Sequence, residues 1–292
     1  MSRPSGLGHR GGIVSPRFSE RIGAVKVEIQ GGTMNAPLRN TIWNFVTQLI
    51  PPRNYNKKMH LDAIDLIAAT VLRVPTQRVD HSAPVWWLLG EVEKMAWAEV
   101  YDLLEFAIAV TGRWTGTTEA QRYAQVNALL EREHSGYRFV SGQLTPITNT
   151  AEITEIEGAV ARAAATGLDG ARQHIETSLG LFGQRPQPDY RNAIKEAISA
   201  VEAIVMGING TRGGGLHGAL EAVSAKIEMH SALKSGLEKL YAYTSDEDGV
   251  RHAILEEANV DEADARFMIV TCSAFVNFLI VKADAAGLLK AR

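Results

Sequence analysis

The stretch between Pro188 and Ala203 limits the fold of this chain more than any other segment. A Pro-Asp pair stands ahead of it, which is typical of the start of a helix. Apolar side chains then recur at spacings of four, three and four residues, at Ile194, Ile198, Val201 and Val205. That spacing places them on one helix face, so we predict a helix that packs against other helices.

The same helix carries a second, polar stripe. Its members follow one another at four, three and three residues: Asn192, Glu196, Ser199 and Glu202. Side chains at these spacings lie along one side of a helix. The stripe is either a solvated face or the lining of a buried polar site, and the pattern alone leaves both interpretations open.

Helical patterns dominate the rest of the chain. In the first half they cover residues 37–50, 61–72, 85–110 and 119–133, and in the second half 152–165, 171–182, 189–207, 216–228, 231–242 and 262–286. We expect β structure only as a short strand at 25–29 and as a hairpin across 137–148, around Ser141-Gly142. The glycine-rich segment 207–215 does not fit the spacing of a phosphate-binding loop and is interpreted as an inter-helix loop.

Five aromatic residues share the long pattern at 85–110: Trp86, Trp87, Trp97, Tyr101 and Phe106. They alternate with Leu, Val and Met at helical spacing, which favours core packing over a base-stacking surface.

Composition restricts the class of protein. With 292 residues, 46% hydrophobic residues and a mean hydropathy of -0.07, the chain is long enough for two ordinary globular domains. No uninterrupted apolar run reaches the ~20 residues of a membrane span, and the segment from Phe267 to Val281 is expected to be a buried helix.

Residues 1–16 lack the apolar core of a signal peptide and are expected to form a flexible tail. A single cysteine, Cys272, rules out an internal disulfide, and a cytoplasmic location is expected.

Charge is distributed unevenly along the chain. Residues 1–60 contain nine Lys and Arg against Glu20 and Glu28, a net charge of +7, which leaves -10 for the remainder because the whole chain carries -3. A basic amino-terminal segment followed by an acidic remainder is either a nucleic-acid-binding surface or a solvent-exposed tail and loop.

Several segments resemble the AbiJ type of bacterial abortive-infection protein. The similar segments are Phe18–Gly23, Leu38–Asn44, the helix from Pro188, the run Tyr241–Ala253 and the apolar helix Ala265–Ile280. The resemblance implies a mainly α protein: a tail at 1–16, an AbiJ-like amino-terminal helical domain with a small β element at 17–150, and a HEPN-like helical bundle at 151–292.

The same resemblance implies antiphage defence and an RNA-targeting site. Active HEPN-like bundles place a His four to six residues after an Arg and cleave RNA across a dimer without a metal. Here Arg251-His252 supplies the Arg and a polar neighbour, but residues 255–257 hold no His. The protein is then either a metal-independent endoribonuclease with a displaced site or a non-catalytic module for sensing, dimerisation or binding of a second defence protein.

A displaced site would combine the polar stripe with the last helix. The catalytic candidates are Arg251, His252 and Glu196; the substrate-binding candidates are Arg191, Asn192, Ser199, Glu202, Arg266 and Asn277. Arg can hold a phosphate and His can move a proton, as RNA cleavage requires. The alternative is a structural polar network between helices. His174 is interpreted as a surface or packing residue. No metal site and no cofactor is expected, and the expected partners are RNA, a second defence protein and a second copy of the chain, with no membrane.

Overall fold

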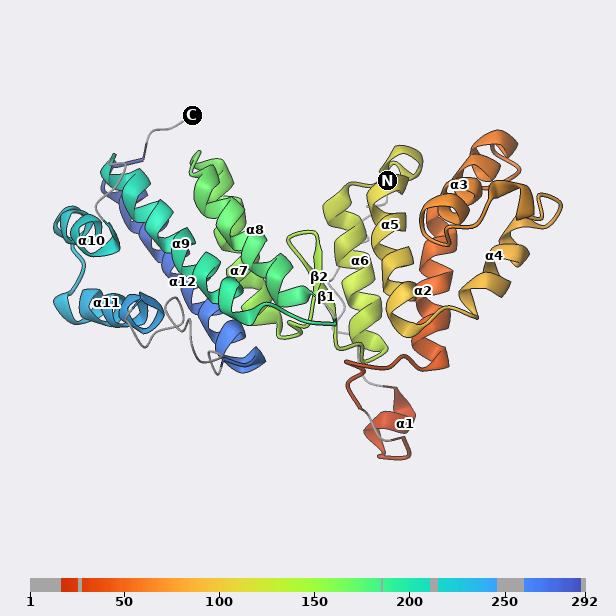
Figure 1. Ribbon diagram of the computed structural model, residues 1–292, viewed down its shortest axis with the longest axis horizontal. Helices are drawn as coiled ribbons and strands as arrows, with labels where there is room; N and C mark the ends of the chain where they lie inside the picture. The colour runs from red at the N-terminus through yellow and green to blue at the C-terminus, as the bar shows by residue number, and fades with distance from the viewer. Residues whose placement is uncertain (1–16, 26–27, 185, 211–214, 246–259, 290–292) are drawn as a thin grey trace, which may run out of the picture. The chain divides into compact units, whose positions relative to one another are not determined.

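The computed structural model describes residues 17–25, 28–184, 186–210, 215–245 and 260–289, without the side chains of 111–115, 215–217 and 244–245. Across these residues the protein is mainly α, as the sequence predicts, with one two-stranded sheet (Figure 1). Contacts divide the chain into two units, Met1–Gly136 and Tyr137–Arg292. The expected tail at 1–16 lies outside the described residues, and the domain boundary at residue 150 stays a prediction.

The first unit is helical throughout. Its elements are α1 (Phe18–Arg21), α2 (Ala36–Leu49), α3 (Lys57–Thr70), the 3-10 helix η1 (Thr76–Arg78), α4 (Pro84–Val92), α5 (Trp97–Thr115) and α6 (Glu119–Arg132). Helix α2 packs against α4, α5 and α6 through fully buried Leu38, Ile42 and Val46. Asn35, Asn56 and Thr118 cap the starts of α2, α3 and α6, since each side chain accepts a backbone amide hydrogen bond.

The long helix predicted at 85–110 is wrong, because α4 ends at Val92 and α5 begins at Trp97. Met95 is buried in the intervening turn. Glu99 Oε2 then accepts a hydrogen bond of 2.7 Å from the amide of Ala96, which fixes a new helix start. Both helices are apolar, so the periodicity continues across the break and hides it.

The prediction that the five aromatic residues of 85–110 pack in the core is wrong for Trp86, which is 75% exposed. Helix α4 buries Pro84, Leu88 and Val92, which lie at spacings of four. Trp86 stands about 200° around the helix from Leu88 and so points away from the core. Tyr101 is buried, whereas Trp87, Trp97 and Phe106 are half-buried.

The strand predicted at 25–29 is absent at the described positions 25, 28 and 29. Pairing starts one residue later, at a single parallel bridge between Gln30 and Ser135. A Cβ at position 136 would lie 2.9 Å from the Gln30 carbonyl oxygen, so only Gly136 allows this approach.

The second unit is a helical bundle preceded by a hairpin. It contains β1 (Arg138–Val140), β2 (Gln143–Thr145), α7 (Thr150–Ala165), α8 (Asp169–Gly183), α9 (Tyr190–Asn209), α10 (Gly215–Lys226), α11 (Ser231–Ser245) and α12 (Glu262–Ala285). Ser141 and Gly142 both take positive φ, at 48° and 83°, which confirms the predicted hairpin turn. The predicted helices of this half are confirmed within a few residues.

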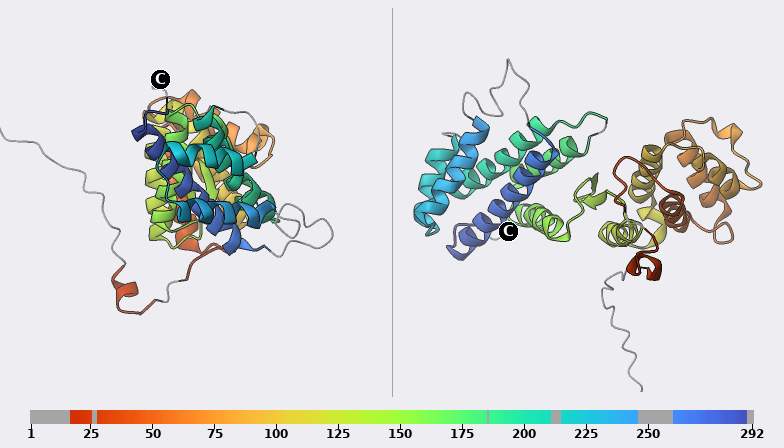
Figure 2. Two further views of the ribbon diagram at one scale, coloured as in Figure 1. Left: turned by 90° about the vertical axis from the view of Figure 1, so that its left-hand side faces the viewer. Right: turned by 90° about the horizontal axis from the view of Figure 1, so that it is seen from below.

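Four helices, α7, α8, α9 and α12, form the body of the bundle, with α10 and α11 together at one side of α9 (Figures 1 and 2). The predicted apolar face of α9 is confirmed, because Ile194, Ile198, Val201 and Val205 are at most 3% exposed. Asp189 caps the start of α9, and Gly210 ends it with φ of 72°.

Helix α12 is the one helix of the described residues that is long and apolar enough to cross a membrane. It packs against α7, α8 and α9 and contributes Met268, Cys272, Val276 and Leu279 to the core. Its apolar length is thus explained by the bundle, as predicted for residues 267–281. Burial raises the pKa of the Cys272 thiol to about 12, which keeps it an unreactive core side chain.

Candidate functional site

A histidine–carboxylate pair joins α8 to α9. His174 Nδ1 lies 2.7 Å from Glu196 Oε2, and the two side chains are 40% and 24% exposed. With the proton on Nδ1, the ring donates to the carboxylate and keeps Nε2 as an acceptor. Nε2 has no hydrogen-bond partner among the described residues. The pair therefore presents an oriented imidazole nitrogen to solvent, the arrangement of a general base.

The two helices bring these residues together as an antiparallel hairpin. The Asp189 amide donates to the Leu181 carbonyl, Ser178 Oγ donates to the Ala193 carbonyl, and His174 meets Glu196. From one contact to the next, the residue number falls by three or four along α8 and rises by three or four along α9, as expected for two antiparallel helices. The register between α8 and α9 decides that His174 meets Glu196, and the sequence carries no direct signal of that register.

A shallow hollow of about 410 Å³ runs along α8, although neither His174 nor Glu196 is among its lining residues. Thr177 and Leu181 line it and follow His174 by three and seven residues, so they share its side of the helix. Most of the remaining lining is polar, from Gln143, Gln173, Glu176, Gly180 and Gln184. Side-chain amides offer both donors and acceptors, which suits the edges of unpaired bases.

The hairpin supplies one wall of this hollow. Gln143 of β2 donates from Nε2 to the Glu176 carbonyl at 2.8 Å. A Cβ at position 180 would lie 3.0 Å from Gln143 Oε1, so Gly180 makes room for the glutamine. Arg172 engages Glu176 at 2.7 Å and thereby neutralises the carboxylate at the rim.

The other predicted residues of α9 do not join this pair. Asn192 donates from Nδ2 to Asp189 Oδ2 at 2.7 Å, so it belongs to the cap of the helix. Arg191, Ser199 and Glu202 are half-buried along the same helix.

The predicted residues of α12 turn toward α7 and the hairpin. Asn277 is 8% exposed and forms a clip: Oδ1 accepts from Arg162 at 2.7 Å, and Nδ2 donates to the Glu155 carbonyl at 2.8 Å. Gly158 leaves space for the clip, since a Cβ there would lie 2.9 Å from Arg162 Nη1. Arg266 bonds Glu262 at 2.5 Å. These contacts are those of a structural network between helices.

The polar stripe of α9 and the polar residues Arg266 and Asn277 of α12 thus face different neighbours and do not converge. Glu196 faces α8, whereas Asn277 faces α7. Arg251 and His252, the centre of the predicted site, lie outside the described residues. Their catalytic role stays a prediction, as do the substrate-binding roles.

A second hollow, of about 370 Å³, lies in the first unit. It is lined by Arg73, Lys94, Glu91, Glu99 and Asp102, together with the apolar residues Val71, Leu72, Val74 and Met95. Burial raises the pKa of Asp102, aided by Glu99 and opposed by Arg73. Its lining holds three carboxylates, which can act as bases, but no histidine–carboxylate pair such as His174 and Glu196.

No cluster of three or more His, Cys, Asp or Glu side chains suited to a metal ion occurs within the described part of the chain.

Comparison with known proteins gives one match. No curated protein and no solved structure matches the chain. The sequence model of AbiJ N-terminal domain 4 matches residues 16–162, half of the chain. The match continues past the division at Gly136 and reaches into α7. The chain therefore belongs to the AbiJ-type family, as its amino-terminal segments suggest.

Proposed function

We propose that this protein is an abortive-infection effector that cleaves RNA, with the His174–Glu196 pair as part of its active site. Family membership supports the defence role. The observation that carries the chemistry is the 2.7 Å contact between His174 Nδ1 and Glu196 Oε2. A hollow lined by three glutamines runs along the same helix, α8.

The proposed reaction is an internal transesterification. His174 Nε2 takes the proton of a ribose 2′-hydroxyl, and the resulting oxygen attacks the neighbouring phosphorus. The bond from phosphorus to the 5′-oxygen breaks, and a second acid returns a proton to that oxygen. The products are a 2′,3′-cyclic phosphate and a 5′-hydroxyl.

The second acid and the phosphate-holding cation come from the HEPN-like pattern of the carboxy-terminal half. His252 would protonate the leaving oxygen, and Arg251 would stabilise the charge that develops on the phosphate. Both remain proposals, since they lie outside the described residues. Glu196 holds the His174 ring in one orientation through the 2.7 Å contact.

The test is cleavage of a mixed set of RNAs, in the presence of a chelator and at saturating RNA, by the full chain. We expect His174→Ala to lower the rate about 100-fold or more, and Glu196→Gln to lower it less, because it preserves a hydrogen-bond acceptor but removes the charge.

A matched control is available in the first unit. His81 Nε2 lies 2.7 Å from Asp65 Oδ1, so this pair has the same length, but it belongs to the first unit and bonds no residue of α8 or α9. His81→Ala should leave the saturating rate unchanged. If Arg251→Ala/His252→Ala abolishes cleavage while His174→Ala does not, catalysis belongs to the predicted motif and the role of His174 is wrong.

A non-catalytic module is the second candidate, and the outer face of α12 favours it. Phe267 and Val281 are 57% and 54% exposed, and Val270, Ala274 and Phe278 continue the stripe at spacings of three and four. No charged residue occurs between Arg266 and Lys282. Such an exposed apolar stripe is typical of an interaction surface.

We propose a second copy of the chain as the occupant of this face. Antiparallel pairing of two α12 helices would set the acidic start, Asp261 to Asp264, against Lys282 of the other copy. Light scattering should then show a dimer that Phe267→Asp converts to a monomer. If the wild-type protein is a monomer and binds a second defence protein through this face, the homodimer proposal is wrong and the face is a site for a different protein. RNA cleavage by a protein that stays monomeric would remove the dimer from the mechanism.

A further inference from the structure

Two aromatic side chains of the first unit are almost fully exposed. Tyr55 is 81% exposed and Trp86 is 75% exposed, and these are the two most exposed large apolar side chains among the described residues. Large aromatic rings are ordinarily buried because they remove much apolar surface from water. Rings left in solvent on a folded unit are available to stack on a ligand.

The segments that carry the two rings are tied together. Arg53, two residues before Tyr55, donates from Nη1 to the carbonyl of Ser82 at 2.9 Å. Ser82 in turn lies four residues before Trp86. Helices α3 and α4, which begin next to these rings, also pack against each other. The two rings therefore stand on neighbouring parts of one surface.

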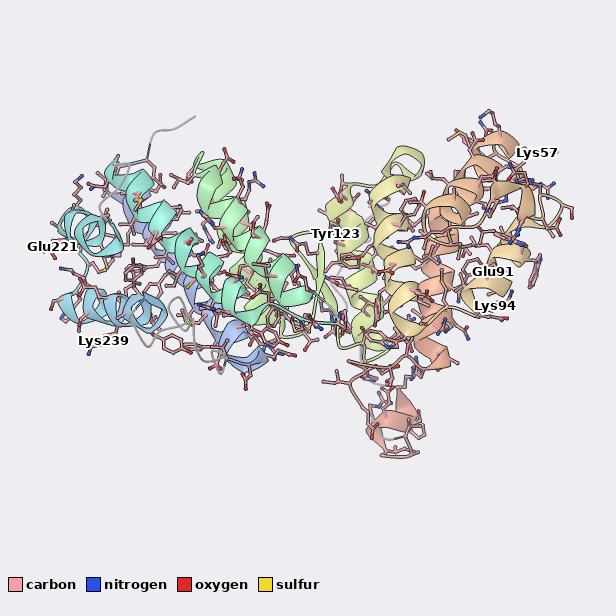
Figure 3. The ribbon with its side chains drawn as sticks, viewed as in Figure 1. Lys57, Glu91, Lys94, Tyr123, Glu221 and Lys239 are labelled. Carbon is pink, nitrogen blue, oxygen red and sulfur yellow. The ribbon has the colours of Figure 1, made fainter. Side chains whose placement is uncertain are left out.

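The surroundings of Tyr55 are polar and basic. Every residue from 53 to 58 is exposed, and the ring is flanked only by Asn, Arg and Lys. Figure 3 places Lys57 at the outer end of α3.

Cations outnumber carboxylates on this segment, and the carboxylates are engaged locally. Five Lys and Arg stand against three Asp between Arg53 and Trp86, a net charge of +2 on a chain of -3. Asp62 bonds Lys58, Asp65 bonds His81, and Asp80 accepts from the amide and hydroxyl of Ser82.

Only Lys58 of these five cations has an ion-pair partner among the described residues. Arg53 donates to the Ser82 carbonyl and Arg73 lines the hollow of the first unit, which leaves Lys57 and Arg78. They are exposed on the same tied segments as the rings. A phosphate backbone supplies the counter-charges that such cations require.

We infer that Tyr55 and Trp86 form a stacking platform for single-stranded nucleic acid, with Lys57 and Arg78 on its phosphates. Exposed aromatics beside cations bind single strands in this way, since every base offers a face to stack on. This surface shares no residue with the α8–α9 site, so it binds nucleic acid whether or not that site cleaves it.

The test is binding of fluorescent 12-nucleotide strands by the full chain: 2′-O-methyl RNA, which cannot undergo the proposed cleavage, DNA of the same sequence, and the corresponding duplex. We expect both single strands to bind more tightly than the duplex. Trp86→Ala and Tyr55→Ala should each weaken single-strand binding about 10-fold or more, and Trp86→Phe should restore most of the loss.

Two controls separate stacking from other effects. Phe18 is an exposed aromatic on α1, at 68%, and Phe18→Ala should bind like wild type. Lys57→Ala/Arg78→Ala should lower the slope of log affinity against log salt by about 1 to 2, which a purely structural effect would not do.

Three results would overturn the inference. The first is single-strand binding that Trp86→Ala and Tyr55→Ala leave unchanged, and the second is equal or tighter binding of the duplex. The third is no nucleic-acid binding at low salt, which would assign the rings to a protein partner. Cleavage at saturating RNA is measured separately, so failure of the cleavage proposal leaves this result unaffected.

Discussion

Two pairs of aromatic residues, one in each unit of this protein, stand in opposite environments. In the second unit Phe182 is fully buried and packs on Tyr190 at 5.9 Å between ring centroids. In the first unit Tyr55 and Trp86 are exposed to solvent on segments that also carry the cations Lys57 and Arg78.

This difference suggests a division of labour. A residue held between two packed helices keeps a fixed position, as proton transfer requires, and His174 is such a residue. Exposed rings near helix starts can adjust to a flexible strand, as binding requires. We therefore assign chemistry to the second unit and strand binding to the first.

The strongest test of the contrast compares two aromatic truncations. Phe182→Ala opens a cavity in a closed core and should lower the free energy of unfolding by about 3–5 kcal/mol. Trp86→Ala removes a ring already in water and should change it by about 0.5 kcal/mol or less. Urea unfolding followed by circular dichroism measures both. If both variants lose the same free energy of unfolding, Trp86 is a structural residue and the contrast between the exposed and the buried aromatic pairs is wrong.

A smaller effect is expected for the Asn277 clip. Asn277→Ala removes three hydrogen bonds in a buried position and should cost about 1–3 kcal/mol. Asn192→Ala, in the exposed first turn of α9, should cost about 0.5 kcal/mol. The clip is not a structural element if the two variants unfold at the same urea concentration.

The smallest expected effect concerns acid stability of the first unit. Glu133 is buried beside Arg132 and Arg17. Burial acts to raise the pKa of Glu133, but the hydrogen bonds from both arginines outweigh it, and the net pKa lies below the usual 4.5.

A lowered pKa in the folded state adds stability at pH above 4.5, and this is lost as the pH falls through the folded-state value. The free energy of unfolding of wild type should exceed that of Glu133→Gln by about 1 kcal/mol at most above pH 4.5. This difference should shrink as the pH falls below 4.5. A gap that stays constant down to pH 3 would show that the ion pairs contribute nothing.

Much of the fold follows from local sequence signals. The apolar spacing of α9, the Asp189 cap and the Ser141-Gly142 turn each determine a local structure, and the structure has all three. Such local signals fail to show the boundary between two consecutive helices that have similar apolar patterns. The break at 93–96 is invisible because α4 and α5 are both apolar, and the exposure of Trp86 depends on which face of α4 meets the core.

The site was only partly predictable. Glu196 stands out in the sequence because it belongs to the polar stripe of α9, but its partner depends on the register between α8 and α9. The expected meeting of Glu196 and Asn277 fails for the same reason: each stripe was placed correctly on its own helix, and the rotation of the helices against each other was not.

The most direct test of the division of labour is RNA cleavage measured over a range of RNA concentrations for wild type, His174→Ala and Trp86→Ala. We predict that His174→Ala lowers the rate at saturating RNA about 100-fold with RNA affinity unchanged. Trp86→Ala should weaken affinity about 10-fold and keep the saturating rate. Cleavage by His174→Ala at the wild-type rate would contradict the account, because the chemistry would then lie elsewhere in the chain.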